Sequence, residues 1–319
     1  MSAPTNTITG ETPNVGARED LEDKIYRVAP EETPFTSNIG KVTAKAIEHE
    51  WQTETLASAV TTNAQLEGDD VGTLDAGNLT TRVKNICQIG WKTGGVSETQ
   101  EAVDLAGRAS ELARQKVLKG IELKRDFEYR FVANVTSVAE NGATTRKAAG
   151  ALAWITTNDS RGSGGSDGGY SAGIVAAATN GTQRTFTEQL VKDVMATAFS
   201  NGARPSQAYM SGTHKQQFSA FTGIADIRAT ASGGGMATIY GAADVYVSDF
   251  GNITLVPHPY ALSRDCLIAD PKMFAVATLR PMSTTMLAKT GDNERFLIRA
   301  EKTLVCRNEK AHAAIADLT

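Results

Sequence analysis

The sequence has 319 residues, of which 41% are hydrophobic and 21% charged, and its formal net charge is -4. This length is enough for one large domain or two smaller ones with a buried core. The mild negative charge argues against a sequence-specific nucleic-acid-binding protein, because such proteins usually carry a basic face.

The N-terminal residues 1–18 are rich in Thr, Asn, Pro and Gly, which predicts an arm without a core of its own. The apolar spacing at 21–28 predicts one short amphipathic helix that ends at Pro30. Residues 33–35, Thr-Pro-Phe, predict a turn with an aromatic anchor. Such a segment is too short to fold alone, so we expect it to dock on another part of the protein.

Residues 42–92 predict long extended structure. Alternation at 46–52 indicates an outgoing strand, and 79–95 indicates a returning one. The candidate packing residues of the return limb are Val83, Ile86, Ile89 and Trp91. The sequence between the limbs is acidic and rich in turn residues. A lone two-stranded ribbon is marginal in water, so we expect this one to lie against other protein.

Residues 97–140 predict one unusually long helix. Ser97 is a suitable N-cap with Gln100 three residues later, apolar residues recur at steps of three and four, and Asn141-Gly142 supplies a stop. At about 1.5 Å per residue the helix would span about 66 Å and make the subunit elongated. We expect bends at Gly107 and Gly120, and two helices separated at Gly120 are the alternative.

The chain beyond the helix predicts a compact α/β module and a strand-rich tail. The Gly-rich stretch 158–173 predicts a flexible surface loop, since it lacks the motif of a phosphate-binding loop. The expected elements are a helix from Thr187 to Asn201-Gly202, a buried strand at 208–212, a helix from Thr213 to Gly223, and strands at 245–251, 252–258 and 266–270. A hairpin turn at 290–293 divides the tail, whose strands we expect to pack on the long helix.

No pattern for catalysis or metal binding stands out. None of the four histidines lies four residues from another or near a cysteine, which disfavours a zinc site. Ser211 lacks the frame of a nucleophile elbow, and His258 lies between two prolines and is expected to be structural. The separate cysteines favour free thiols in a reducing compartment, and no membrane span or secretory signal is visible. We therefore expect no enzyme activity, cofactor or metal.

Charge suggests how copies of the chain contact one another. The predicted ribbon tip carries Glu67, Asp69, Asp70 and Asp75. One half of the long helix is basic and includes Lys116, Lys124 and Arg125. If copies lie side by side, contact of the tip with the helix is favourable and sets register more than strength. Phe35 and Trp51 are the apolar residues that we expect at such contacts.

The ordered set of sequence segments resembles the tailed-bacteriophage major capsid proteins, which have the Hong Kong 97-type fold. The resemblance covers nearly the whole chain and rests on EDLEDKIYRVAPEETPFTSNIGK, EWQTETLA, LKRDFEYRFV, GALAWITTN and AEKTLVCRNEKAHAAI. It implies an α+β fold that is divided as follows: N-terminal arm 1–45, extended loop 46–95, spine helix and start of the peripheral domain 96–149, axial domain 150–270, and peripheral-domain strands with the C-terminus 271–319.

The resemblance also implies a function. Copies of the chain would form the pentamers and hexamers of an icosahedral shell around double-stranded DNA, bound without sequence specificity, in a virion assembled in the host cytoplasm. The expected partners are a separate scaffolding protein, a portal and a decoration protein. The scaffold is expected to be separate because only about 45 residues precede the extended loop.

Three other functions are alternatives. An encapsulin-type compartment shares the fold and differs in cargo, so a neighbouring portal or terminase gene would favour the phage protein. A secreted surface or adhesin protein is disfavoured by the missing signal peptide and the long charged helix. A hydrolase using Ser211 or the Gly-rich loop is disfavoured by the lack of an acid–base constellation.

Overall fold

The computed structural model describes residues 24–68, 70, 72, 74–221 and 244–319. The predictions for the arm at 1–18 and for the start of the amphipathic helix lie outside these residues. Residues 24–33 form neither helix nor strand, and Ile25 and Val28 are 45% and 102% exposed, so the helix predicted there is wrong. The first helix is α1 (Pro34–Asn38). It begins at the proline because the N–H that proline lacks would have no partner at a first helical position.

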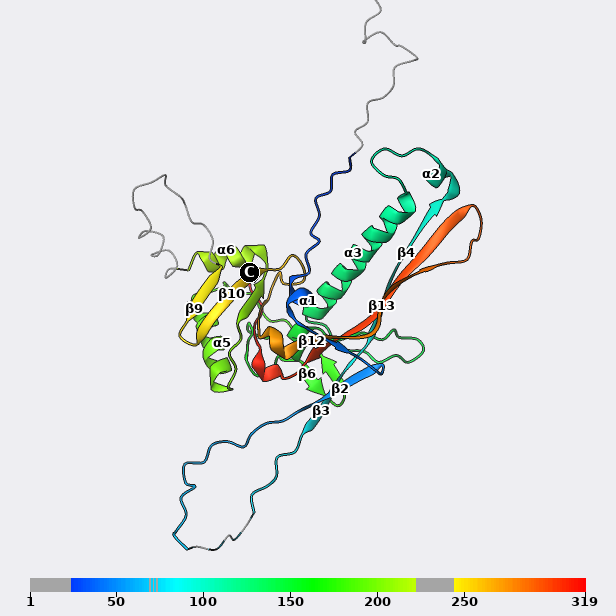
Figure 1. Cartoon of the computed structure of the whole chain (residues 1–319). Helices are drawn as coiled ribbons and strands as arrows, with labels where there is room; N and C mark the ends of the chain where they lie inside the picture. The colour runs from blue at the N-terminus through cyan, green and yellow to red at the C-terminus, as the bar shows by residue number, and fades with distance from the viewer. Residues whose placement is uncertain (1–23, 69, 71, 73, 222–243) are drawn as a thin grey trace, which may run out of the picture.

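A four-stranded sheet forms the long body of the subunit (Figure 1). Its order is β1 (Gly40–Thr43), β12 (Phe274–Met286), β13 (Asn293–Cys306) and β4 (Gln88–Ser97). β12 and β13 are an antiparallel hairpin with register from Phe274–Cys306 to Met286–Phe296. The hairpin predicted around 290–293 is therefore confirmed.

One face of this sheet is covered by α3 (Glu111–Val132), as predicted. The helix and strand approach closely at Gly90, where a Cβ atom would lie 2.8 Å from the Phe127 ring. Because side chains alternate along a strand, Ile89 and Trp91 point away from α3. They are 38% and 66% exposed, so of the four candidate packing residues only Val83 and Ile86 are buried within the subunit.

The single long helix predicted for 97–140 is wrong. Ser97 does cap a helix and accepts a hydrogen bond from Gln100 N, but that helix is the short α2 (Glu98–Ala102). The chain then leaves helical geometry until Ser110 caps α3 by accepting from Ala113 N. Gly107 in the break has φ +72, a conformation that favours glycine, whereas α3 runs unbroken through Gly120.

The end of α3 at Val132, before the predicted stop at Asn141-Gly142, has a tertiary cause. Arg130 Nε donates to Ala148 O and its Nη2 donates to Thr136 O, both at 2.7 Å. These contacts hold the returning chain against the helix end, where Ala133 is extended. At Gly150 the approach is so close that a Cβ would lie 2.0 Å from Ala133 O. The four-residue helix α4 (Ala151–Trp154) follows and is buried.

A second sheet has six strands. Its order is β5 (Asp159–Ser160), β14 (Ala313–Ile315), β11 (Cys266–Ala269), β8 (Gln207–Met210), β10 (Gly251–Pro257) and β9 (Val245–Ser248). The strands predicted near 208, 245, 252 and 266 are confirmed. The C-terminal strand β14 pairs with β11 and β5 in this second sheet, apart from β12 and β13. The assignment of 271–319 to the peripheral domain stays a prediction.

The middle strands of the six-stranded sheet, β14, β11 and β8, are buried on both faces, whereas β9 exposes Val245 and Val247. α5 (Glu188–Ser200) and α6 (Gly212–Ser219) contribute to the core on one face. The other face packs against the first module, which consists of the four-stranded sheet with α1, α3 and α4. There Phe35 of α1 contacts Tyr209 of β8, with ring centroids 5.3 Å apart. Ser211, and not the predicted Thr213, caps α6 by accepting from His214 N. The predicted helix end at Gly223 lies outside the described residues.

The Gly-rich stretch predicted as a flexible loop is closely packed. It contains β6 (Gly169–Ser171), which forms a small hairpin with β7 (Ile174–Ala176) directly after the stretch. A Cβ atom at Gly162 would lie 2.0 Å from Thr182 O, and one at Gly168 would lie 2.1 Å from Ala176 O. Gly162 and Gly168 therefore serve close backbone contacts.

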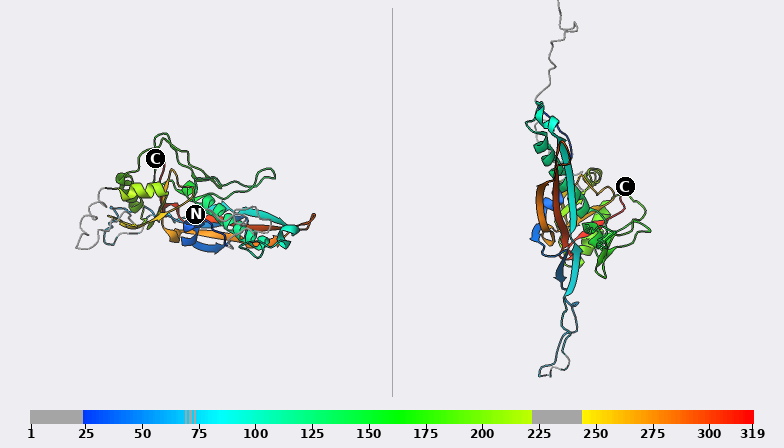
Figure 2. Two further views of the ribbon diagram at one scale, coloured as in Figure 1. Left: turned by 90° about the horizontal axis from the view of Figure 1, so that it is seen from above. Right: turned by 90° about the vertical axis from the view of Figure 1, so that its right-hand side faces the viewer.

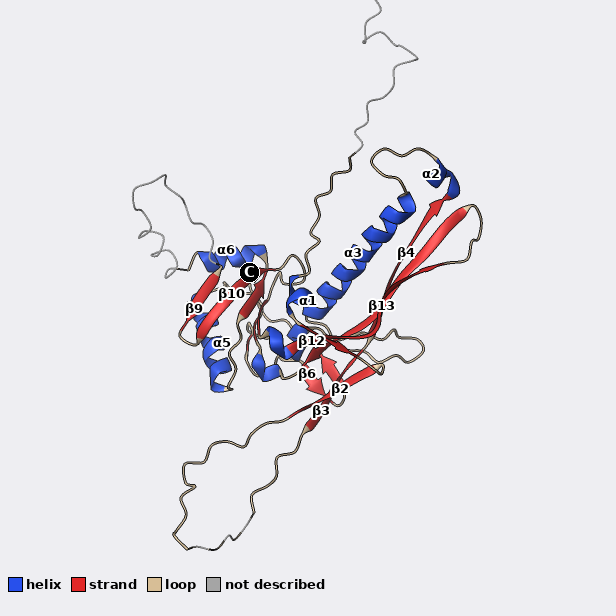
Figure 3. Cartoon of the chain, viewed as in Figure 1, coloured by secondary structure: helices blue, strands red, loops and turns tan. Residues whose placement is uncertain are grey.

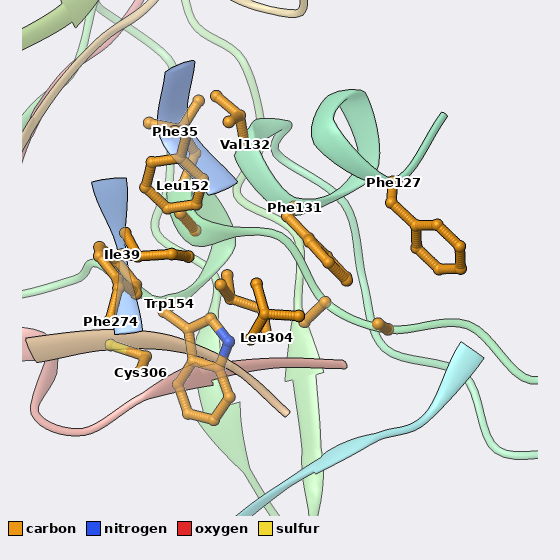
Figure 4. Close-up of a cluster of buried hydrophobic side chains, with 14 of the residues drawn as sticks. Phe35, Ile39, Phe127, Phe131, Val132, Leu152, Trp154, Phe274, Leu304 and Cys306 are labelled. Atoms are coloured by element: carbon orange, nitrogen blue, oxygen red, sulfur yellow. The ribbon is translucent and has the colours of Figure 1, made fainter. Parts of the chain in front are cut away.

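The first module is centred on an aromatic and aliphatic cluster between α1, α3, α4 and the first sheet (Figure 4). Cys306 belongs to it, and all three cysteines are buried and free. Two short 3₁₀ turns, η1 (Pro271–Met273) and η2 (Glu309–Ala311), flank the C-terminal strands. The two modules lie side by side in a flat, elongated subunit (Figure 2).

Candidate functional site

The most unusual feature of the subunit is the segment 54–80, which projects from its body (Figures 1 and 3). It connects β2 (Glu48–Thr53) to β3 (Thr81–Ile86), which pair antiparallel from Glu48–Ile86 to Thr53–Thr81. The predicted ribbon is confirmed at this base. Within the described part of 54–80 no residue is in a helix or strand. The predicted strands therefore stop well before the tip.

The projecting segment exposes large apolar side chains. Five of them are 67–87% exposed: Leu56, Val60, Leu66, Leu74 and Leu79. Their burial against other protein would be worth about 1.5–3 kcal/mol for each fully buried side chain. An exposed apolar surface of this kind is typical of a protein–protein contact site.

Aromatic side chains fix the base of the segment to the body. The ring centroids of Trp51 and Trp154 lie 5.4 Å apart, and Tyr170 stacks on Trp154 at 5.8 Å. Lys84 Nζ also pairs with Glu48 Oε2 across the ribbon at 2.7 Å. The contacts described for Trp51 are thus within its own chain, at the point from which the segment projects. A role for Trp51 between subunits stays a prediction.

Phe35 does not form the inter-subunit contact that we predicted. Its side chain is completely buried in its own subunit, where it meets Tyr209 and Phe274 at centroid distances of 5.3 and 5.4 Å. The prediction of an aromatic anchor is confirmed, but the anchor holds α1 to both modules of the same chain.

The acidic residues predicted at the tip lie on the projecting segment. Glu67, Asp70 and Asp75 are exposed, and Asp69 lies outside the described residues. The segment extends away from α3 of its own chain (Figure 1). A contact between these acids and the basic helix could therefore form only between different copies.

The basic residues of α3 are mostly engaged within the subunit. Lys119 pairs with Glu122 at 2.9 Å, Arg125 lies 5.3 Å from the centre of the Tyr260 ring, and Lys116 lies 5.9 Å from that of Phe296. Among the residues of α3 that we predicted to contact a neighbour, Lys124 is the exposed one. This leaves a smaller basic surface than the sequence suggests.

The residues considered for catalysis have structural roles. The Ser211 hydroxyl caps α6, and the His214 ring lies edge-on to Phe186 at 5.9 Å. His258 is buried and contacts Glu128 at 2.9 Å. Within the ranges described, no group of three or more His, Cys, Asp or Glu side chains is placed to hold a metal ion. No helix there is long and apolar enough to span a membrane.

A second surface was missed by the sequence patterns. Trp91 and Ile89 of β4, together with Arg130, Arg146 and Lys147, line a cleft of about 490 Å³. The sequence signal that could have revealed it is the pair Gly90 and Gly94. Both glycines lie on the packed face of β4, which leaves the odd-numbered residues Ile89, Trp91 and Thr93 on the other face.

Comparisons with known proteins agree with one another. A family model described as "SU10 major capsid protein" matches residues 3–319. The protein described as "Major capsid protein" of Escherichia phage Phieco32 is 36% identical over 114 residues, which make up 35% of this chain and 32% of that protein. The matched part of the chain thus spans about a third of the length of that relative.

Solved structures match over nearly the whole length of the chain. A chain of the cyanophage A-1(L) capsid asymmetric unit has a TM-score of 0.70 at 11% identity and covers 98% of this chain and 100% of its own. A chain of the capsid of a native GTA particle has a TM-score of 0.58 at 12% identity, with 99% and 100% covered. A chain of Mycobacterium phage Bobi has a TM-score of 0.60 at 10% identity, with 95% and 96% covered. The α+β fold expected from the resemblance is confirmed.

Proposed function

The chain belongs to the SU10 major capsid protein family, and we propose that its copies assemble into the pentamers and hexamers of an icosahedral shell that encloses double-stranded DNA. As a major capsid protein it is a component of the phage virion. We include in the proposal a separate scaffolding protein, a portal, a decoration protein, and assembly in the host cytoplasm.

The observation that carries the assembly proposal is the projecting segment 54–80. Its described residues form no helix or strand and expose five large apolar side chains. In a free subunit this surface is in contact with water, and burial against neighbouring copies would stabilise the assembly. A flat subunit with one long projection suits a shell in which each copy overlaps the next (Figure 2).

Charge is compatible with a DNA container. The net charge of the chain is -4, so the wall as a whole does not bind the phosphate backbone strongly. DNA held without sequence specificity needs no base-reading side chains, and packaged DNA must remain free to move. The proposal therefore places no nucleic-acid site on the chain.

Electron microscopy of the purified chain, alone and with its scaffolding protein, tests the proposal. Closed icosahedral particles are the expected result. A chain that stays monomeric under every assembly condition, or shells that enclose an enzyme cargo in place of DNA, would contradict it. The second outcome would identify an encapsulin-type compartment.

A further inference from the structure

The edges of the two sheets differ in length. In the part of the chain that the structure describes, the six-stranded sheet ends in β5 and β9, of 2 and 4 residues, and the four-stranded sheet ends in β1, of 4 residues, and β4, of 10. An edge strand presents unpaired backbone N–H and C=O groups, and short edges limit unwanted pairing. β4, by contrast, is a long edge strand.

The opposite side of the same sheet is protected by a proline. β1 pairs with residues 275–278 of β12 only, so the distal half of β12 also lies at an edge. That half contains Pro281, which cannot donate a backbone hydrogen bond and interrupts any added strand. The contrast shows that one free edge of this sheet is blocked by its sequence.

β4 has no comparable protection. It contains no proline, and its one charged residue, Lys92, is drawn toward α3 by Asp126 at 2.7 Å. The edge of β4 that faces away from β13, here called the outer edge, forms no backbone hydrogen bonds to another strand of the described chain. Strand addition to such an edge is a common mode of protein recognition.

Two clefts flank the outer edge. One, of about 490 Å³, is lined by Trp91, by the basic side chains of Arg130, Arg146 and Lys147, and by Glu140, which pairs with Arg146. The other, of about 250 Å³, lies toward α3 and is lined by Leu123 and Phe127. Both clefts adjoin β4 between Gln88 and Trp91, so an added strand would have space for its side chains on both faces at this end of β4.

We propose that the outer edge of β4 accepts residues 55–61 of a second copy as an additional strand. The inference rests on the proposed assembly and names the backbone contact by which the projecting segment engages its neighbour. The segment 55–61, Thr-Leu-Ala-Ser-Ala-Val-Thr, contains neither proline nor charge. Leu56 and Val60 are 87% and 67% exposed and would lie on one face of a strand.

Length and charge also fit this occupant. Seven extended residues span about 23 Å, which is shorter than the roughly 33 Å of a ten-residue strand. The whole segment 54–80 contains no Lys or Arg but includes Glu54, Glu67 and three Asp residues. A segment without positive charge is not repelled by the basic side chains that line the cleft beside Trp91.

The donor must come from another copy. β3 runs from the projecting segment into the body, and β4 begins two residues after β3 ends. The segment and β4 therefore extend from the body in opposite directions (Figure 1). The segment 55–61 cannot fold back onto the outer edge of its own β4.

A proline scan of residues 56–60 tests the pairing. In an added strand, alternate N–H groups point to the receiving edge. Proline at the positions whose N–H groups point to the receiving edge, either all even-numbered or all odd-numbered, should therefore lower the yield of shells by about tenfold or more. Proline at the alternate positions should lower it by less than about threefold. The matched controls replace each residue with alanine, or with serine at 57 and 59. The segment forms no backbone ladder in the subunit, so the variants are expected to fold.

Hydrogen–deuterium exchange gives an independent measurement on β4. Alternate β4 amides should exchange at least about tenfold more slowly in shells than in unassembled subunits. Wild-type shells combined with a flat proline scan, or with unprotected β4 amides, would overturn the inference and leave the proposed function intact. Protection of β4 without sensitivity of 56–60 would also overturn it, because another segment would then occupy the edge. A wild-type chain that forms no shells would instead reject the proposed function.

Discussion

His258 Nε2 lies 2.9 Å from Glu128 Oε1, and neither side chain is exposed to solvent. The same carboxylate accepts hydrogen bonds from Phe35 N at 2.7 Å and Thr36 N at 2.9 Å. Glu128 belongs to α3, His258 follows β10, and the two amides lie at the start of α1. One buried carboxylate thus joins the arm, the spine helix and the six-stranded module.

We predict that Glu128→Gln destabilises the subunit by about 3 kcal/mol, because a buried charge-assisted network loses its anion and one amide donor then faces another. Urea unfolding of the unassembled subunit measures the effect. Glu122→Gln on the same helix is the control, since Glu122 is partly exposed and pairs with Lys119. Equal stability of the two variants would show that the Glu128 network does not hold α1 in place.

Two glycines predict opposite effects of the same substitution. A Cβ at Gly120 meets nothing within 4 Å, and the residue lies within α3, so Gly120→Ala should stabilise the subunit by about 0.5–1 kcal/mol. A Cβ at Gly150 would lie 2.0 Å from Ala133 O, so Gly150→Ala should destabilise it by about 2 kcal/mol or more. Thermal unfolding separates the two. A destabilising Gly120→Ala would mean that flexibility at this position matters.

The elements of the fold differ in how far the sequence could predict them. Local signals located α5, the 290–293 hairpin and the strands of the second module, because caps, turn residues and periodicity act over a few residues. Signals for the break before α3 were present, namely Ser110 as a cap and Gly107. The end of α3 at Val132 was not predictable, because it depends on Arg130 contacts with carbonyl groups 6 and 18 residues away. The place of β14 depends on a partner strand distant in sequence.

The candidate site, too, is predictable where it depends on local sequence and not where it depends on distant contacts. The projecting segment could be predicted from its turn-rich, acidic composition, and Phe35 could be identified as an anchor. Its partners could not, because Tyr209 and Phe274 come from strands far along the chain. The free edge of β4 depends on strand order, which no local pattern encodes.

The buried Asp159 predicts a stability that depends on pH. Burial, and then a hydrogen bond to Asp167, raises the pKa of Asp159 to about 7, against about 3.9 in an unfolded chain. Between about pH 4 and 7 the folded state therefore binds more protons, and its free energy of unfolding falls as the pH rises. Although burial opposes it, hydrogen bonds with Asp159 and Arg161 lower the pKa of Asp167, so the effect of Asp167 lies below about pH 4.

Asp159→Asn should remove this dependence, because an amide can donate to Asp167 at any pH. Relative to the wild type, the variant should gain on the order of 2 kcal/mol between pH 5 and pH 8, as measured by urea unfolding at each pH. The exposed Asp104 provides the control variant Asp104→Asn. Parallel pH profiles of wild type and Asp159→Asn would contradict the assignment.

Reversal of charge at the tip should impair assembly without affecting folding. The triple variant Glu67→Lys, Asp69→Lys and Asp70→Lys is expected to reduce shell yield, while its free energy of unfolding stays within about 0.5 kcal/mol of the wild type, as is usual for surface substitutions. The neutral variants with Gln and Asn should have a smaller effect, and added salt should narrow the difference. An unchanged shell yield would remove the proposed contact between the tip and a basic neighbour.

Removal of the projecting segment separates folding from assembly. Thr53 and Thr81 are partners in the β2–β3 register, so Asn-Gly in place of 54–80 closes a two-residue hairpin between them. The described residues of the deleted segment contribute no large side chain to the buried core. We therefore expect the stability of the subunit to change by less than about 1 kcal/mol and shell formation to be lost. Light scattering and electron microscopy measure the second effect.

The paired variant keeps the full segment and replaces its five exposed large side chains, Leu56, Val60, Leu66, Leu74 and Leu79, with serine. If apolar burial drives the contact, this variant should also fail to assemble, because each fully buried side chain contributes about 1.5–3 kcal/mol. If backbone pairing alone is sufficient, the serine variant should assemble where the deletion does not. Normal shells from the deletion variant would reject the segment as the assembly element.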